Sequence, residues 1–184
     1  VPIGRLICAS NSNNVLTDFL CTGVYDRNRT FYNTMSPSMD ILISSNLERL
    51  LFSLSNHDDA EVRGYMEELA RSGRYEVSPA IKGRLEKLFA AGFCDDDQTQ
   101  KVIGRMWQEH RYLIDPHTAV AFDVLDQYRR DTGDTTPTVV VSTASPFKFC
   151  TDVLDALGVS DRAQGLDVLD QLSQVTGEPV PAPL

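Results

Sequence analysis

The stretch PTVVVSTASPFKF, residues 137–149, constrains the fold of this chain more than any other part of the sequence. Its three consecutive valines follow a proline and lead directly into hydroxyl-bearing residues, a pattern typical of a short buried strand that ends in a polar turn. Ser145 is expected to be the N-cap and Pro146 the first residue of a following helix. The apolar residues on the inner face of that helix are Phe149, Val153, Leu154 and Leu157. The stretch therefore predicts a strand, a polar turn and a helix.

The polar turn contains two candidate ligand-binding hydroxyls, those of Ser142 and Thr143. In open α/β sheets, ligands bind beyond the carboxyl ends of strands, where the N-terminus of a helix adds free N–H groups and a positive partial charge. The alternative is that both hydroxyls only satisfy backbone groups within the turn.

A second polar run follows a second expected strand, RLICA, at residues 5–9. Residues 10–14 read SNSNN, and Asn11 and Asn13 are the candidates for contact with a ligand. Neutral amides at the end of a strand suit a polar, anionic small molecule. The run is also compatible with an ordinary loop in which Asn side chains mimic turns.

A third candidate lies in the sequence DPHT, where His117 stands two residues after Asp115. The Asp-Pro pair predicts a turn, and His117 is expected at the start of a helix. The imidazole could act as an acid, a base or a phosphate ligand. It could equally cap the helix.

Helical periodicity dominates the middle of the chain. Helices are expected over residues 39–62 with a new N-cap at Asn46, over 58–72 up to Gly73, from Ser78 to a C-cap at Gly92, from the acidic run 95–97 onward, from 117 to Gly133, and over 166–172. The segments 3–14 and 112–158 bear the strands, segment 39–111 is mainly helical, and 175–184 is a frayed tail. Two strands about 130 residues apart cannot form a parallel sheet alone, so the chain is expected to be one end of a larger α/β protein.

The composition excludes several classes of function. A net charge of −9 argues against nucleic-acid binding, and no apolar run is long enough to indicate a membrane span or signal peptide. The four cysteines form no CxxC pair, and the three histidines show no ligand spacing with them, so no metal site is expected. Reduced thiols of this kind indicate an intracellular, cytoplasmic protein.

Four long segments resemble the threonine synthase family, pyridoxal-phosphate enzymes with the tryptophan-synthase-β-like fold (fold type II). They are ICASNSNNVLTDFLCTGVYDRNRTFY (7–32), SPSMDILISSNLERLLF (36–52), LIDPHTAVA (113–121) and VVVSTASPFKF (139–149). The resemblance spans most of the chain and implies its C-terminal portion, a helix-rich α/β segment with a few parallel strands.

The resemblance implies a carbon–oxygen lyase that converts O-phospho-L-homoserine and water into L-threonine and phosphate, in threonine biosynthesis. It implies pyridoxal 5'-phosphate as an electron sink. Thr143 takes the position whose hydroxyl binds the pyridine nitrogen, with Ser142 beside it. Asn11, Asn13 and His117 are implied to lie near the cofactor or in the same cleft.

Two family elements are missing from this sequence, the lysine that binds the cofactor covalently and the glycine-rich loop that cradles its phosphate. Lys148 lies two residues after Pro146, where packing or ion pairing is the expected role. We therefore expect no catalytic residue in this chain, no activity and no retained cofactor in the chain alone, and a partner in the missing N-terminal portion of the enzyme. The chain is expected to be an excised or processed piece.

Two other functions remain open on the residues alone. The chain could be a non-catalytic binding or assembly module whose exposed strand edges recruit a partner. It could also be a hydrolase that uses a serine such as Ser45, although it lacks the Gly-x-Ser-x-Gly turn and an evident base.

Overall fold

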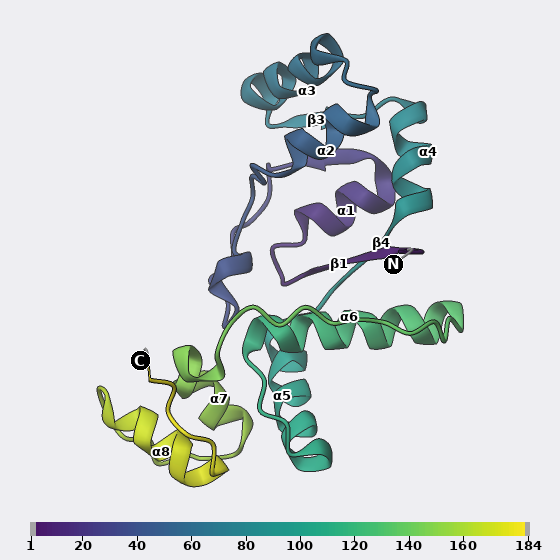
Figure 1. Cartoon of the computed structure of the whole chain (residues 1–184). Helices are drawn as coiled ribbons and strands as arrows, with labels where there is room; N and C mark the ends of the chain where they lie inside the picture. The colour runs from purple at the N-terminus through teal and green to yellow at the C-terminus, as the bar shows by residue number, and fades with distance from the viewer. Residues whose placement is uncertain (1–2, 183–184) are drawn as a thin grey trace.

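The computed structural model describes residues 3–182, in which helices greatly outnumber strands (Figure 1). The elements are β1 (Leu6–Ser10), α1 (Val15–Thr22), β2 (Val24–Asp26), the 3-10 helix η1 (Pro37–Met39), α2 (Leu47–Leu54), α3 (Asp59–Ser72), β3 (Arg74–Glu76), α4 (Pro79–Leu88), β4 (Phe89–Phe93), α5 (Asp96–His110), α6 (Pro116–Thr132), the 3-10 helix η2 (Pro146–Phe149), α7 (Cys150–Ala156) and α8 (Asp167–Thr176). This helix-rich α/β arrangement agrees with the predicted class. Residues 183 and 184, at the end of the predicted tail, lie outside the described residues.

The strands of the described chain form two separate pairs. β1 and β4 are parallel, with Leu6 opposite Phe89 and Ser10 opposite Phe93, while β2 and β3 are antiparallel. A parallel pair needs a long crossover, and here the chain from α1 to α4 provides it. The strand expected at RLICA is therefore present as β1, although only Ser10 of its residues is buried.

The strand expected at Val139–Ser142 is absent, and this prediction was wrong. The segment runs back along α6 without regular secondary structure (Figure 1). Val139 is 87% and Val141 71% exposed. A strand needs a neighbour to satisfy its N–H and C=O groups, and the described chain places none beside this segment.

Gly92 is not the C-cap of a helix, contrary to the prediction. Helix α4 ends at Leu88, and the next five residues, FAAGF, form β4 beside β1. The small side chains of this strand suit close packing, because a Cβ on Gly92 would lie 2.9 Å from Val124 Cγ1 of α6. Pairing with a distant strand thus overrides the local helical pattern.

Helix starts and ends follow local chemistry. The side chains of Asp58, Ser78 and Asp95 each accept a hydrogen bond from the backbone N–H three residues later, as N-caps do. Gly73 and Gly133 end α3 and α6 in the left-handed conformation. Asn46 precedes α2 as expected but makes no side-chain cap, and residues 40–46 are not helical.

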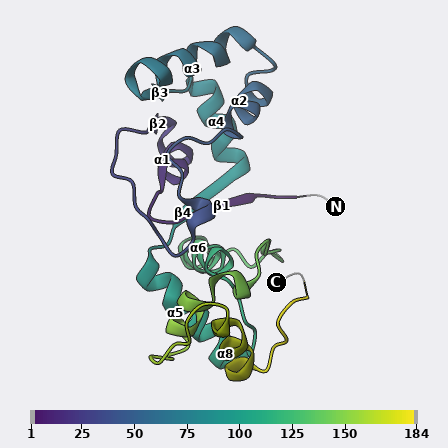
Figure 2. The ribbon, with the colours of Figure 1, turned by 90° about the vertical axis from the view of Figure 1, so that its left-hand side faces the viewer.

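Two larger hydrophobic cores lie at opposite ends of the molecule, with α6 and the β1–β4 pair between them (Figures 1 and 2). The first core joins α1 to α4 with β2 and β3, and Tyr25 and Tyr75 stack at its centre with ring centroids 5.3 Å apart. The second joins α5 to α8. In a small third cluster, Ile7 and Ala9 of β1 pack against Val120 and Val124 of α6 and against Cys94, which follows β4. β1 and α6 therefore meet between the two cores.

Residues 3–182 contain neither a candidate membrane span nor a candidate metal site. No helix there has the length and hydrophobicity to cross a bilayer. No group of three or more potential metal ligands gathers in that range either.

Candidate functional site

A cleft of about 420 Å³ opens where β1, η1, the start of α6 and segment 138–143 meet. It is lined by Ile7, Ala9, Ser38, Met39, His117, Thr118, Ala121, Leu125, Thr138, Val139, Val140, Val141 and Thr143. The walls combine apolar side chains with a few hydroxyls and one imidazole, a composition typical of small-molecule sites. Two of the residues predicted to bind a ligand, Thr143 and His117, lie in this cleft.

Asp115 organises the start of α6. It is the N-cap, Pro116 occupies the first helical position, and the carboxylate accepts hydrogen bonds from the backbone N–H groups of His117 and Thr118. The Thr118 hydroxyl donates to its other oxygen. Burial alone would raise the pKa of Asp115, but the hydrogen bonds from His117 and Thr118 outweigh burial and hold that pKa below its ordinary value. Asp115 is therefore a buried carboxylate kept in its charged form.

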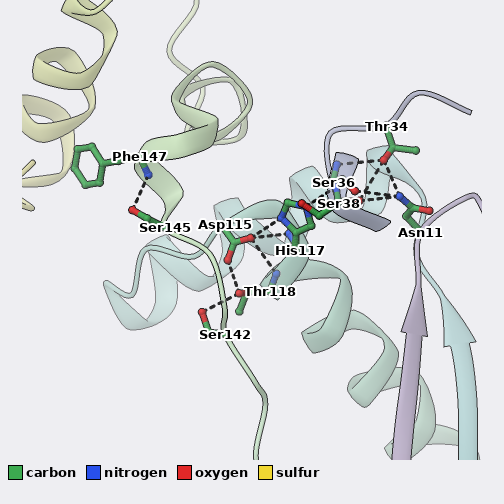
Figure 3. Close-up of polar contacts among 10 residues, drawn as sticks. All are labelled: Asn11, Thr34, Ser36, Ser38, Asp115, His117, Thr118, Ser142, Ser145 and Phe147. Carbon is green, nitrogen blue, oxygen red and sulfur yellow. Dashed lines mark hydrogen bonds and ion pairs between the residues drawn. The ribbon is translucent and has the colours of Figure 1, made fainter. Parts of the chain in front are cut away.

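His117 lies between Asp115 and η1 (Figure 3). Its Nδ1 is 2.8 Å from Asp115 Oδ1, and its Nε2 accepts a hydrogen bond of 3.1 Å from the backbone N–H of Ser38. The ring of Phe149 packs against it with centroids 4.8 Å apart. The imidazole borders the cleft, but both of its nitrogens already have protein partners.

Ser142 and Thr143 are neighbours on segment 138–143, which faces the start of α6. The hydroxyls of Ser142 and Thr118 are hydrogen-bonded at 2.9 Å, which ties segment 138–143 to the start of α6 (Figure 3). Thr143 is exposed and lines the cleft, and within residues 3–182 its side chain makes no hydrogen bond. Its hydroxyl is thus free to meet a ligand.

Asn11 and Asn13 are close by but do not line the cleft. Both are buried, and both amides donate to Asp40 Oδ1, at 2.7 and 2.9 Å. The Asn11 amide nitrogen Nδ2 also donates to the Ser36 carbonyl, and it lies 3.1 Å from the Ser36 hydroxyl oxygen. In this structure the two amides hold the loop that contains η1 against the end of β1.

The sequence reasoning missed this loop. Thr34, Ser36 and Asp40 form the network around Asn11, and Ser38 contacts His117. Asp40 falls within the helix expected over residues 39–62, but it is not helical in the structure. The available signal was the alternation of hydroxyls at positions 34, 36 and 38 just before Asp40, which suits an irregular polar turn better than a helix.

None of the four lysines lines the cleft within residues 3–182. Lys148 is exposed on η2 and borders a different groove, between η2 and the start of α8. Lys82 lies 2.7 Å from Glu86 on α4. The cleft therefore offers hydroxyls and apolar walls but no amine.

The chain is similar in sequence to threonine synthases. The family model "Threonine synthase, C-terminal" matches residues 118–178. Human "Threonine synthase-like 1" is 38% identical over 162 residues, covering 88% of this chain and 21% of the relative. Threonine synthase of Saccharomyces cerevisiae is 34% identical over 186 residues, covering 93% of this chain and 36% of the yeast protein. The chain thus spans about a fifth to a third of the length of the curated relatives it matches.

The fold agrees with the sequence comparison. The crystal structure of threonine synthase from Brucella melitensis with bound pyridoxal phosphate superimposes with a TM-score of 0.80 at 38% identity. The match covers 92% of this chain and 36% of the Brucella chain. Nearly all of this chain therefore has the fold found in part of a pyridoxal-phosphate enzyme.

Proposed function

We infer that this chain, whose sequence and fold match the C-terminal portion of threonine synthases, forms one wall of the cofactor cleft of a pyridoxal-phosphate lyase. The reaction proposed for the complete enzyme converts O-phospho-L-homoserine and water into L-threonine and phosphate. The observation that carries the proposal is the fold match to the cofactor-bound Brucella enzyme over 92% of the chain. A free Thr143 hydroxyl in a cleft of suitable size supports it.

The residues present fit one side of pyridoxal phosphate. A volume of about 420 Å³ lies within the usual range for small-molecule sites, and Ile7, Ala9 and Leu125 offer an apolar surface to an aromatic ring. Thr143 would hold the ring nitrogen, with Ser142 fixing its backbone. The residues for the aldehyde and phosphate ends of the cofactor are expected from another segment, because the cleft has no lysine.

When bound, the cofactor supplies an electron sink that stabilises negative charge on the substrate carbons. The contribution proposed for this chain is to bind and orient. A carboxylate beside the ring nitrogen would force that nitrogen to carry a proton. The neutral hydroxyl of Thr143 can hydrogen-bond the ring nitrogen without this effect. The apolar wall of Ile7, Ala9 and Ala121 excludes water from that side of the cleft.

We propose that the partner of this chain is the segment that corresponds to the N-terminal portion of its relatives. The chain covers only 36% of the Brucella enzyme, and the exposed Val139 and Val141 are suited to pairing with further strands. By the same proposal the isolated chain is inactive and does not retain the cofactor. The four free thiols favour a reducing, cytoplasmic location.

The test is a chimera in which this chain replaces the matching C-terminal portion of the Brucella enzyme. The isolated chain and the chimera are each given pyridoxal phosphate and O-phospho-L-homoserine, and phosphate and threonine are measured. We expect both products from the chimera and neither from the isolated chain. Threonine formed by the isolated chain would contradict the inactivity proposed for it. A chimera that folds and binds the cofactor but releases no phosphate would contradict the proposed reaction and favour a non-catalytic assembly module.

A further inference from the structure

His117 joins two segments that are far apart in the sequence through its two ring nitrogens. Nδ1 is 2.8 Å from Asp115 Oδ1, Nε2 accepts the backbone N–H of Ser38 at 3.1 Å, and the side chain is only 11% exposed. A ring nitrogen that accepts from an N–H carries no proton. The neutral ring must therefore hold its proton on Nδ1 and donate it to the Asp115 carboxylate.

The contacts on either side of the ring extend this link across the whole cleft (Figure 3). On one side, the ring contacts Ser38, which belongs to η1. Asn11, directly after β1, donates its amide N–H to the carbonyl of Ser36, directly before η1. On the other side, Asp115 accepts the Thr118 hydroxyl, and Thr118 is hydrogen-bonded to Ser142, the neighbour of Thr143. A continuous set of hydrogen bonds thus connects η1 to the segment that carries the proposed cofactor ligand.

We propose that His117 is a positioning residue whose neutral, Nδ1-protonated ring fastens η1 to the start of α6 and so sets the separation of the cleft walls. While it does so, Nε2 has no free lone pair with which to take a proton from a substrate. This role is distinct from the acid, base or phosphate-ligand roles that the sequence left open. It rests on the contacts of this chain and does not depend on the proposed reaction.

The proposal has a consequence for acidic solution. A proton added to Nε2 turns an acceptor into a donor, which then faces the donor N–H of Ser38, so η1 loses its contact with α6. Asp115 is the charged group in direct contact with the ring. The other titratable groups on the surrounding segments are Asp40 after η1, Lys148 on η2 and Cys8 on β1, while segment 138–143 has none. Asp40 accepts hydrogen bonds from Asn11, Asn13 and Thr34.

Nuclear magnetic resonance of the full 184-residue chain tests the tautomer directly. With histidines labelled with ¹⁵N, we expect His117 Nδ1 to give the signal of a protonated nitrogen and Nε2 that of an unprotonated one at neutral pH. On acidification, the Ser38 amide proton should shift upfield in step with protonation of the His117 ring. A ring protonated on Nε2 at neutral pH, or a Ser38 amide that does not respond when the ring gains its second proton, would overturn the proposal.

Two variants test the contact of each ring nitrogen separately, that of Nε2 with Ser38 and that of Nδ1 with Asp115. In His117→Gln the side-chain oxygen can reach the place of Nε2, so the Ser38 amide should keep its downfield position and no longer change with pH. In His117→Asn the shorter amide can reach only Asp115, so the Ser38 amide should lie upfield at every pH. His110→Gln, on the exposed end of α5, is the control and should behave as the unaltered chain. The proposal fails if His117→Asn leaves the Ser38 amide unshifted. If a variant does not fold, the tautomer measured in the unaltered chain decides whether the proposal holds.

Discussion

Asp115 shows how much of this structure depends on single side chains. Its side chain is 0% exposed, yet the carboxylate is satisfied by two backbone N–H groups, the Thr118 hydroxyl and the His117 ring. An unpaired carboxylate in this position would be strongly destabilising. Because the hydrogen bonds favour the charged form, the stability of the fold should depend on the protonation of this one residue.

Replacement of Asp115 by Asn should reveal this dependence. The folded pKa lies below the ordinary value of 3.8, so the charged carboxylate stabilises the fold above that value and its contribution is lost as the pH falls through the folded pKa. At pH 7 we expect Asp115→Asn to lower the free energy of unfolding by on the order of 2 kcal/mol. Urea unfolding at several pH values should show the difference shrinking below about pH 4. The exposed Asp161→Asn serves as control, and a difference for Asp115→Asn that does not change with pH would contradict the argument.

Thr143 provides the second prediction at this scale. In the chimera with the Brucella N-terminal portion, Thr143→Val should remove one hydrogen bond to the cofactor, worth on the order of 1 kcal/mol, or about fivefold in activity. In the isolated chain, where the Thr143 side chain is exposed, the stability should be unchanged. Thr143→Ser should restore activity. Thr138→Val, in the same cleft, is the matched control, and equal losses in Thr138→Val and Thr143→Val would argue against a specific role for Thr143.

At the scale of elements, the contact between α5 and α7 depends on a glycine. A Cβ on Gly104 would lie 2.8 Å from the backbone carbonyl oxygen of Ala156, a contact that no rotamer change can relieve. The close approach packs Val102 and Ile103 against Val153 and Leu154 in the second core. Gly64, in α3, has nothing within 4 Å of the same position.

Replacement by alanine should therefore have opposite effects on the free energy of unfolding at these two glycines. Gly104→Ala should force the helices apart and lower the free energy of unfolding by roughly 1–3 kcal/mol. Gly64→Ala should raise it by up to about 1 kcal/mol, because alanine favours the helix. Thermal or urea unfolding followed by circular dichroism measures both. A Gly104→Ala variant as stable as the unaltered chain would show that the α5–α7 contact is not tightly packed.

Elements were predictable where their signals are local. Asp58, Ser78 and Asp95 cap helices with atoms three residues away, so sequence alone located those helix starts. Strands depend on partners. FAAGF reads as the end of a helix until β1 is placed beside it, and the valines of segment 138–143 look buried although the described chain has nothing to cover them. Sequence likewise placed His117 beside Asp115, but not beside Ser38, which is 79 residues away.

At the scale of the whole molecule, the chain exposes apolar side chains on a segment between its two larger cores. Two well-packed cores account for most of its buried apolar residues. Between them, Val139 and Val141 are exposed on a segment whose sequence strongly favours a buried strand. Exposed apolar residues of this kind commonly mark a surface that another part of a protein covers.

The double change Val139→Lys and Val141→Lys tests whether this surface is covered in the complete enzyme. In the isolated chain it should alter the free energy of unfolding by no more than about 0.5 kcal/mol, since both side chains already face solvent. In the chimera it should lower stability by about 3 kcal/mol or more, because two buried valines are each worth roughly 1.5–3 kcal/mol. Leu166→Lys, 80% exposed just before α8, is the control and should have little effect in either protein. If the double change leaves the chimera as stable as the control does, the valines stay exposed in the assembled protein and segment 138–143 does not join a larger sheet.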